Sequence, residues 1–348
     1  MFNTLKKSSL TLLIASTALF QFGCKDDSKD PDLVGNWYKK GVPSFGGSPR
    51  YGTVSFMINN IGYIGTGYTS ESVQRAKDFW AYDATSKIWS QMAPFAGTGR
   101  NDAVAFVAGG KAYVGTGYDG VTTIDNGYKK DFFQYTPATN TWKAIADFPG
   151  SPRQYASAFS VGDNGYVGLG WNRNLGFYQD IYKYNAASDT WTEMATFLGG
   201  KRRGATAFTI GEIAYVGFGL TNSNINARDL YQFEANGNGG KGAWTQKTVF
   251  NDDNGDFPPG RDNASSLVIN NLGYIVGGGT GLSDVWEYNP GTDKWVEKTR
   301  FPGSRGSAAA FVVNNIGYFG TGVSNTTPTD DFWGFDPSAA DNDDDNVN

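Results

Sequence analysis

The sequence predicts an all-β protein built from six copies of one structural unit. A Gly-Tyr or Ala-Tyr pair that opens a glycine-rich strand end recurs six times in the 348 residues, and successive tyrosines of these six pairs lie 44 to 59 residues apart. Each copy carries short runs of aromatic and β-branched residues between Gly, Asn, Asp and Pro turns, which is the pattern of short strands. Four strands per copy of roughly 50 residues correspond to one blade of a β-propeller. We therefore expect a six-bladed propeller, whose six repeated tyrosines are Tyr63, Tyr113, Tyr166, Tyr215, Tyr274 and Tyr318.

The chain begins with the features of an export signal. Residues 1–23 contain Lys6 and Lys7, then an apolar stretch from Leu10 to Phe22, which is the plan of a secretory signal peptide. This stretch is too short to span a membrane. The only cysteine, Cys24, follows directly, and Phe22-Gly23-Cys24 resembles a bacterial lipobox, in which the cysteine is lipidated after cleavage. The alternative is an ordinary signal followed by a free thiol.

Residues 24–35 are expected to form a lipidated tether. The charged cluster from Lys25 to Asp30 resembles the export signal with which some Gram-negative lipoproteins reach the cell surface, although a solvated tether would have the same composition. We expect an exported outer-membrane lipoprotein, which faces either the periplasm or the cell surface. Its membrane contact would be the lipid anchor alone, because no second apolar run is long enough to span a bilayer.

Each unit has the same order of elements. An arginine precedes a strand of small and apolar residues, the Gly-Tyr strand follows, an aspartate then opens an aromatic strand, and a turn leads to a tryptophan. This order resembles the kelch repeat, and the resemblance, to kelch propellers of the galactose oxidase-like type, covers residues 36–338, followed by an acidic tail at 339–348. The arginines are Arg50, Arg100, Arg153, Arg203, Arg261 and Arg305, the aspartates are Asp78, Asp131, Asp180, Asp229, Asp284 and Asp331, and the tryptophans are Trp89, Trp142, Trp191, Trp244 and Trp295.

The sixth unit lacks its tryptophan, which predicts how the ring closes. Trp37 stands 13 residues before Arg50, much as Trp89 stands 11 residues before Arg100. We expect residues 36–40 to form the outer strand of the last blade, so that the N-terminal strand closes the ring and covers a strand edge that would otherwise be open to aggregation.

The six arginines allow two interpretations. The kelch resemblance implies that they lie near one mouth of the central channel, where Arg100 and Arg153 could bind an anionic ligand bidentately. Each unit also supplies one aspartate, and a feature present in every copy more often belongs to the scaffold. A repeated internal salt bridge is therefore favoured over an anion site.

Binding residues are expected where the copies differ. The loop after the Gly-Tyr strand carries unequal residues at one position, and the residues beside the arginines, including Tyr155, also vary. Aromatic rings near amides and carboxylates suit a sugar, which stacks on a ring and takes directional hydrogen bonds. The alternative is that the rings only pack between blades. The variable loop residues are Tyr68, Tyr118, Trp171, Leu220, Gly279 and Val323.

Composition excludes several functions. The chain has no histidine, which removes the Ser-His-Asp triad and the usual histidine ligand sets of catalytic metals. Without residues 1–23 the balance is 27 basic against 34 acidic residues, or −7, so nucleic acid is not an expected partner. The acidic runs at 251–256 and 341–346 do not complete a calcium-binding loop and are interpreted as a solvated loop and tail. We expect neither a metal nor a cofactor.

Two classes of function remain for what we expect to be a monomer. The first is a surface-anchored binding module for a glycan or a protein, with Tyr68, Tyr118, Tyr155 and Trp171 as ligand-binding candidates. The kelch resemblance also implies enzymes: a copper radical oxidase and iron-dependent specifier proteins, whose histidines are absent here, and a bacterial sialic acid mutarotase. The second class is therefore a metal-free enzyme that acts on a sugar through carboxylates, for which Asp102 and Asp262 are the first candidates.

Overall fold

The computed structural model describes residues 33–69, 74–121, 125–247, 257–279, 281–342 and 346. Leu33–Asn348 is one compact unit. The expected signal peptide, Cys24, the charged cluster at 25–30 and the acidic run at 251–256 lie outside the described residues, as does half of the acidic tail.

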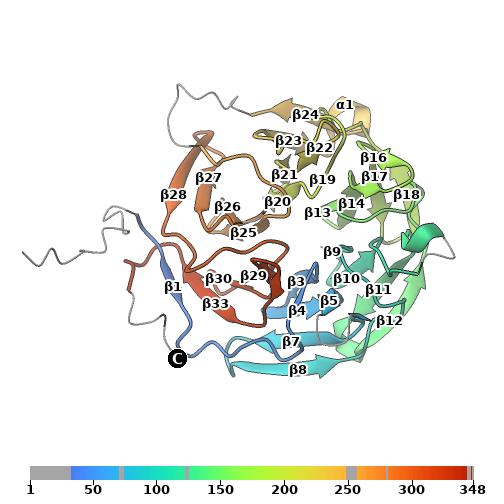
Figure 1. Ribbon diagram of the computed structural model, residues 1–348. Helices are drawn as coiled ribbons and strands as arrows, with labels where there is room; N and C mark the ends of the chain where they lie inside the picture. The colour runs from blue at the N-terminus through green and yellow to red at the C-terminus, as the bar shows by residue number, and fades with distance from the viewer. Residues whose placement is uncertain are drawn as a thin grey trace, which may run out of the picture. The chain divides into compact units, whose positions relative to one another are not determined.

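Six four-stranded antiparallel sheets form a ring in this unit (Figure 1). Blade 1 contains β3 (Val54–Ile58), β4 (Ile61–Gly65), β7 (Phe79–Asp83) and β8 (Ile88–Met92), and blade 2 contains β9 (Val104–Ala108), β10 (Lys111–Gly115), β11 (Phe132–Thr136) and β12 (Thr141–Ile145). Blade 3 contains β13 (Ser157–Val161), β14 (Asn164–Gly168), β17 (Ile181–Asn185) and β18 (Thr190–Glu193), and blade 4 contains β20 (Thr206–Ile210), β21 (Ile213–Gly217), β23 (Leu230–Glu234) and β24 (Ala243–Gln246). Blade 5 contains β25 (Ser265–Ile269), β26 (Leu272–Val276), β27 (Val285–Asn289) and β28 (Lys294–Lys298), and blade 6 contains β29 (Ala309–Val313), β30 (Ile316–Gly320), β33 (Phe332–Asp336) and β1 (Asn36–Tyr38).

Shorter elements occupy the connections. They are β2 (Arg50–Tyr51), β5 (Tyr68–Thr69), β6 (Gln74–Arg75), β15 (Trp171–Asn172), β16 (Gly176–Phe177), β19 (Arg202–Arg203), β22 (Leu220–Thr221), β31 (Val323–Ser324), β32 (Thr327–Pro328), the short helices η1 (Asp125–Gly127) and η2 (Pro137–Thr139), and α1 (Gly237–Gly240). Because neighbouring strands are antiparallel, the loops between the second and third strands share one end of the ring with the connections between blades. We call this end the mouth face.

The prediction of ring closure is confirmed. β1 pairs antiparallel with β33, with Trp37 opposite Phe335, and the two strands lie side by side in Figure 1 although they are 300 residues apart in sequence. The Trp37 side chain is fully buried and donates a hydrogen bond to the carbonyl of Thr299 at 3.0 Å, as Trp142 of blade 2 does to the carbonyl of Ala93. β1 therefore takes the place of the fourth strand of blade 6.

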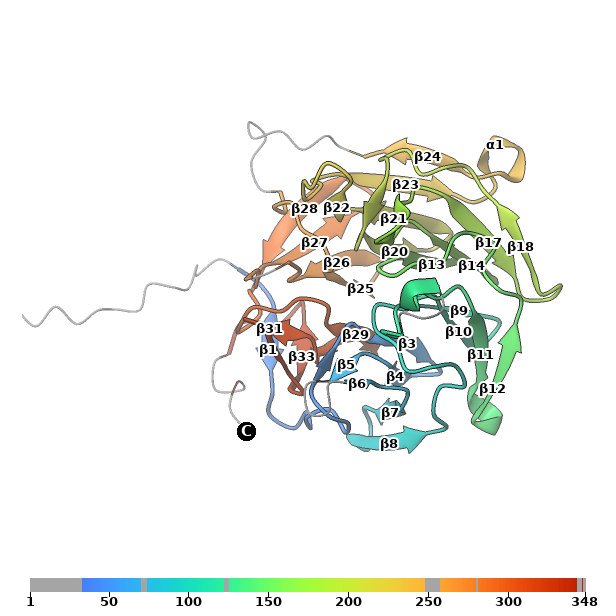
Figure 2. The same ribbon diagram turned by 45° about the vertical axis from the view of Figure 1, so that its right-hand side comes forward.

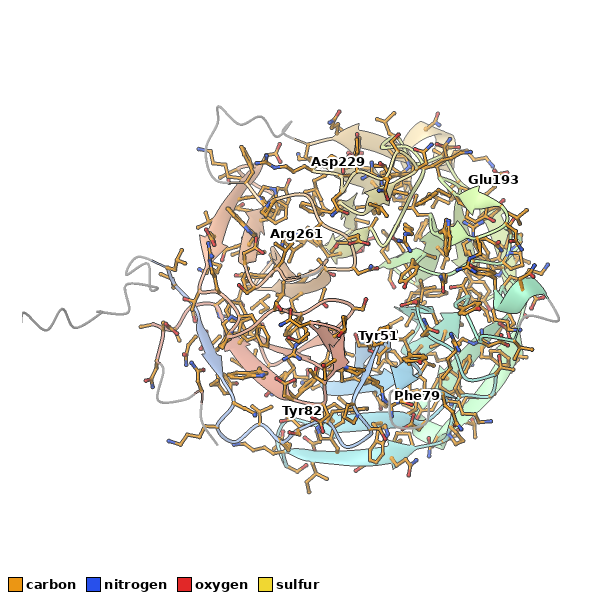
Figure 3. The ribbon with its side chains drawn as sticks, in the orientation of Figure 1. Tyr51, Phe79, Tyr82, Glu193, Asp229 and Arg261 are labelled. Carbon is orange, nitrogen blue, oxygen red and sulfur yellow. The ribbon has the colours of Figure 1, made fainter. Side chains whose placement is uncertain are left out.

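The core lies between the blades. In the described residues, six clusters of buried apolar side chains each join two neighbouring blades, including the pair formed by blades 6 and 1. The small residue before each repeated tyrosine follows from this packing, because a Cβ at Gly62 or Gly165 would overlap the ring of Phe311 or Phe106 in the preceding blade. Figure 3 shows Phe79 and Tyr82 in blade 1 lying farther from the centre of the ring than Tyr51.

The first strands of the blades surround the centre. Each of β3, β9, β13, β20, β25 and β29 contacts the first strands of both neighbouring blades, and Figure 2 shows them around the middle of the ring. Every blade therefore brings the start of its first strand, and the residues just before it, to the mouth of one central channel.

Candidate functional site

The mouth of the channel is bounded by a closed ring of backbone hydrogen bonds. One residue from each blade belongs to this ring, and each N–H donates to the carbonyl of the ring residue in the preceding blade, at 2.8 to 3.1 Å. All six have φ between 52° and 63°, in the left-handed region. This conformation is rare for a large side chain such as that of Tyr155. The six members, which we call the mouth ring, are Gly52, Asp102, Tyr155, Gly204, Asn263 and Ser307.

A cavity of about 300 Å³ opens at the mouth ring and is lined by its residues together with alanines and serines of the first strands. A second cavity of about 160 Å³ lies along the same strands. The wall hydroxyls of Ser55, Ser157 and Ser266 donate to carbonyls of neighbouring blades, at 2.8 to 2.9 Å. Because these hydroxyls already donate, the directional polar groups of the cavity are concentrated at its mouth.

Asp102 is a buried carboxyl group in the mouth ring. It is 7% exposed, accepts a hydrogen bond from Asn101 Nδ2 at 2.5 Å, and accepts another from the hydroxyl of Tyr155. Burial raises the pKa of Asp102 to about 7, although these hydrogen bonds and the charges of Arg203 and Arg75 act in the opposite direction. The carboxyl group therefore exchanges a proton near neutral pH. The charge of Asp102, followed by burial, raises the pKa of Tyr155.

The structure corrects the arginine predicted for blade 4. Arg202, not Arg203, occupies the repeated scaffold position, and it pairs with Asp229 at 2.6 Å. The signal was present in the sequence, because Arg202 stands 13 residues before Tyr215, the spacing found between arginine and tyrosine in every other unit. Arg203 is therefore not part of the repeated ion-pair scaffold. It occupies the next position along the chain, closer to the mouth ring.

Arg203 is a cation without an ion-pair partner among the described residues. Its guanidinium lies over the rings of Tyr155 and Trp171, at 5.0 and 5.3 Å from their centroids, and its Nε has no hydrogen-bond partner in this part of the chain. Its charge opposes the rise that burial causes in the pKa of Asp262. Asp262, in the equivalent position of blade 5, accepts a hydrogen bond from Asn263 Nδ2 at 3.0 Å. The sequence predicted Asp262 as a site residue, and it placed Arg203 near the mouth only as one of the six repeated arginines, not as a cation outside the salt-bridge set.

The variable loop residues lie beside the mouth. Each pairs through its backbone with the residue that follows the scaffold arginine, for example Tyr68 with Tyr51 and Trp171 with Gln154. The Tyr51 and Tyr68 rings are 5.4 Å apart, and Figure 3 shows Tyr51 near the centre of the mouth face.

The aromatic rings form a wall rather than an open platform. The Arg75 guanidinium lies over both Tyr68 and Tyr118, at 5.5 and 4.6 Å, and Arg75 Nε donates to Asn101 Oδ1 at 2.7 Å. Tyr118 then contacts Tyr128, which contacts Trp171. Tyr118 and Trp171 each have a face engaged by an arginine of a neighbouring blade, as the alternative of packing between blades expects. The sugar platform stays a prediction.

Arg100 and Arg153 are scaffold residues. Both are fully buried, and their guanidiniums form bidentate ion pairs with Asp131 and Asp180, with the closest N–O distance 2.5 Å in each. Each Nη1 also donates to a carbonyl at the end of the second strand. Neither arginine lines the cavity, so the structure gives no support to binding of a ligand by these two side chains. The other pairs are Arg50–Asp78, Arg202–Asp229, Arg261–Asp284 and Arg305–Asp331.

Neither a metal cluster nor a membrane-spanning helix is found in the part of the chain that the structure describes. Within those residues, no group of three or more Cys, Asp or Glu side chains is placed to hold a metal ion. No helix there is both long enough and apolar enough to cross a membrane.

Comparison with known proteins identifies the class. The family model of the KLHDC2/KLHL20/DRC7 Kelch-repeats domain matches residues 34–219, and the model of the Kelch motif matches residues 260–302. The chain therefore belongs to the kelch-repeat family of β-propellers. Among solved structures, one titled "Structure of YjhT" is similar, with a TM-score of 0.70 and 17% sequence identity over 84% of this chain and 96% of that chain. This likeness concerns the fold, and no curated protein matches the sequence.

Proposed function

We propose that this propeller is a binding module that holds a glycan at the channel mouth. The supporting observation is a difference in charge pairing among the described residues. All six scaffold arginines are paired with carboxylates, whereas Arg203, Asp102 and Asp262 at the mouth form no ion pair. The charge of Arg203 is therefore not neutralised by a carboxylate within the described fold and remains available to a ligand, while Asp102 and Asp262 are hydrogen-bonded but form no ion pair.

The chemistry of the mouth suits a sugar. Sugar hydroxyls both donate and accept hydrogen bonds, and the mouth offers a guanidinium, carboxyl groups and the Asn263 amide within one rim. A volume of about 300 Å³ lies at the lower end of the range for ligand pockets, which favours one sugar unit rather than a large ligand.

The proposed lipid anchor is compatible with this site. β1 begins at the end of blade 6 opposite the mouth face, because Asn36 pairs with Asp336 at the end of β33. Residue 339 lies beside this end as well, since the N–H of Gly35 donates to the carbonyl of Ala339 at 2.9 Å. The chain before β1 therefore joins the propeller on the side away from the mouth, so an anchor at Cys24 would be attached to the opposite face from the proposed site.

Asp102 favours a second candidate function. A buried carboxyl group that exchanges its proton near pH 7 has the property required of a general acid or base. A metal-free enzyme that acts on a sugar, resembling sialic acid mutarotase, would use this group, with Asp262 as a second carboxylate. An Asp102→Asn variant that binds sugar normally but loses turnover would favour the enzyme, whereas absence of turnover in the wild-type chain would favour the binding module.

The proposed function is tested by a thermal-shift and calorimetric screen of the mature chain against neutral sugars, sialic acid and uronic acids. One class of sugar should raise the melting temperature, because a ligand that binds only the folded state stabilises it. Arg203→Met should weaken that binding at least tenfold with little change in stability, and Arg173→Met, at an exposed arginine of the same face, is the matched control. Failure of every sugar to bind would contradict the proposal and favour a protein partner.

A further inference from the structure

The rim of the mouth carries larger side chains over blades 1 to 4 than over blades 5 and 6. We call these two parts the high side and the low side of the rim. The loop position that pairs with the residue after the scaffold arginine carries Tyr68, Tyr118, Trp171 and Leu220 in the first four blades. In blades 5 and 6 it carries Gly279 and Val323, and the residue paired with Val323 is Gly306. The six-fold scaffold therefore supports a one-sided wall.

Loop length separates blade 5 from all five other blades. Between the second and third strands, blade 5 has residues 277–284, or eight residues, whereas the other blades have 11 to 16. A shorter connection places less chain above the mouth. The longer connections are 66–78, 116–131, 169–180, 218–229 and 321–331.

The space above the rim is open at Gly279 among the described residues. A Cβ added there would meet no atom closer than Asp262 Oδ1, at 3.9 Å. At the mouth ring, by contrast, a Cβ added at Gly52 or Gly204 would overlap the side chain of Asp102 or Asn263 from the next blade. The low side of the rim therefore has room directly above Asp262.

The low side is also polar. Asp262, Asn263 and Ser307 supply a carboxyl group, an amide and a hydroxyl group, all partly exposed, and Asn263 and Ser307 line the cavity. The high side is closed by ring contacts and by Arg75, whose Nε is already bonded to Asn101. Among the described residues, blade 5 and its border with blade 6 combine hydrogen-bonding groups with open space, so a chain of sugar units would leave the mouth there.

We propose that the mouth binds the terminal unit of a glycan chain and that the rest of the chain leaves over Asp262 and Gly279 of blade 5. This inference rests on the proposed glycan-binding function and adds to it the manner of recognition. The mouth holds one end unit, the wall of blades 1 to 4 stops the chain on one side, and the unit next to the end contacts the polar side of the rim.

The test compares ligands of increasing length. Cello-, xylo-, N-acetylchito- and galacturono-oligosaccharides of one to four units are titrated into the mature chain by calorimetry. For the series that binds, affinity should rise roughly five- to tenfold from one unit to two or three, as one or two added hydrogen bonds provide, and then level off. A bulky fluorophore at one end of the chain should abolish binding, and the same fluorophore at the other end should be tolerated.

A variant locates the exit. Gly279→Asn keeps a residue type that tolerates a positive φ and places a side chain in the open space, so it should remove the gain in affinity with length while leaving the affinity for one unit within twofold. Leu220→Asn, at the equivalent position of the wall, is the matched control and should keep the gain. If Gly279→Asn fails to fold, the two end-labelled ligands decide the question with the unaltered chain.

The two proposals fail differently. Affinity that does not rise with length, or equal tolerance of the fluorophore at both ends, would overturn recognition of a chain end and leave glycan binding standing. Failure of every series to bind would overturn glycan binding, and the inference that rests on it would fall as well.

Discussion

At the residue scale, the mouth combines backbone strain with unusual protonation. Tyr155 and Asp102 both adopt left-handed backbone conformations that larger side chains seldom take, and the closed ring of hydrogen bonds holds them there. Strain of this kind is tolerated where the surrounding structure fixes the residue, and it concentrates at functional sites. The same ring keeps the Asp102 carboxyl group out of water.

The raised pKa of Asp102 predicts a pH dependence of stability. Between its pKa in the unfolded chain, about 4, and its folded value of about 7, only the folded state holds the proton, so stability from this group falls as pH rises through that window. Asp102→Asn should therefore gain stability relative to wild type at pH 8 compared with pH 5, by up to about 3 kcal/mol. Thermal and urea unfolding at the two pH values measure this difference.

Tyr155→Phe serves as the control for that titration. The Tyr155 hydroxyl donates to Asp102 and favours its charged form, so removing the hydroxyl should move the titration of Asp102 to higher pH. An effect of Asp102→Asn that is the same at pH 5 and pH 8 would contradict the assignment of a proton to this carboxyl group.

At the element scale, each blade is joined internally by a buried arginine. In blades 1 to 5 the scaffold arginine links the start of the first strand to the aspartate before the third strand and to a carbonyl after the second, so one side chain connects three strands. In blade 6, Arg305 pairs with Asp331 and donates to the hydroxyl of Thr329 instead of such a carbonyl. In blade 1, burial alone would raise the pKa of Asp78, but the hydrogen bonds and charge of Arg50 outweigh it and hold that pKa below its usual range.

Removing the aspartate of one such ion pair should cost more stability than removing its arginine. Asp180→Ala leaves the fully buried Arg153 charge without its partner and should destabilise the chain by about 3–5 kcal/mol. Arg153→Met leaves Asp180, which keeps 23% exposure to water, and should cost less. Urea unfolding gives both values. If Arg153→Met lowered the free energy of sugar binding by as much as it lowered the free energy of unfolding, or by more, Arg153 would again be assigned to the binding site.

The sequence shows both the strength and the limit of reading a repeat. Four strands per unit, the arginine–aspartate pairing and the role of Trp37 were all predictable, because each depends on a spacing that recurs. The position of Arg202 was missed because two arginines stand side by side, and a constant distance to Tyr215 resolves them. The ring formed by Gly52, Asp102 and their equivalents could not be predicted, because it joins different blades through backbone groups and no residue type marks it.

At the scale of the whole molecule, the ring distributes its core among six interfaces and leaves the mouth for function. Each interface buries its own apolar cluster, so no single blade has a complete core. Five blades are continuous in sequence, and only blade 6 combines the two ends of the propeller. The backbone ring at the mouth exists only when all six blades are in place, so closure of the propeller and the geometry of the site are linked.

Loss of β1 should therefore affect both stability and the mouth. Trp37 is fully buried against Phe301, Phe319 and Phe335, with ring centroids 4.5 to 5.7 Å apart, so Trp37→Ala should cost about 3–5 kcal/mol. Trp142→Ala, in the same position of blade 2, should cost a similar amount without opening the junction between the chain ends.

A chain that begins at residue 49 should melt well below one that begins at residue 31, and equal melting temperatures would show that the ring does not depend on β1. If the mouth depends on closure, hydrogen exchange at the backbone amide of Gly52 should accelerate in Trp37→Ala, because this amide donates to the carbonyl of Ser307 and so closes the ring between blades 6 and 1.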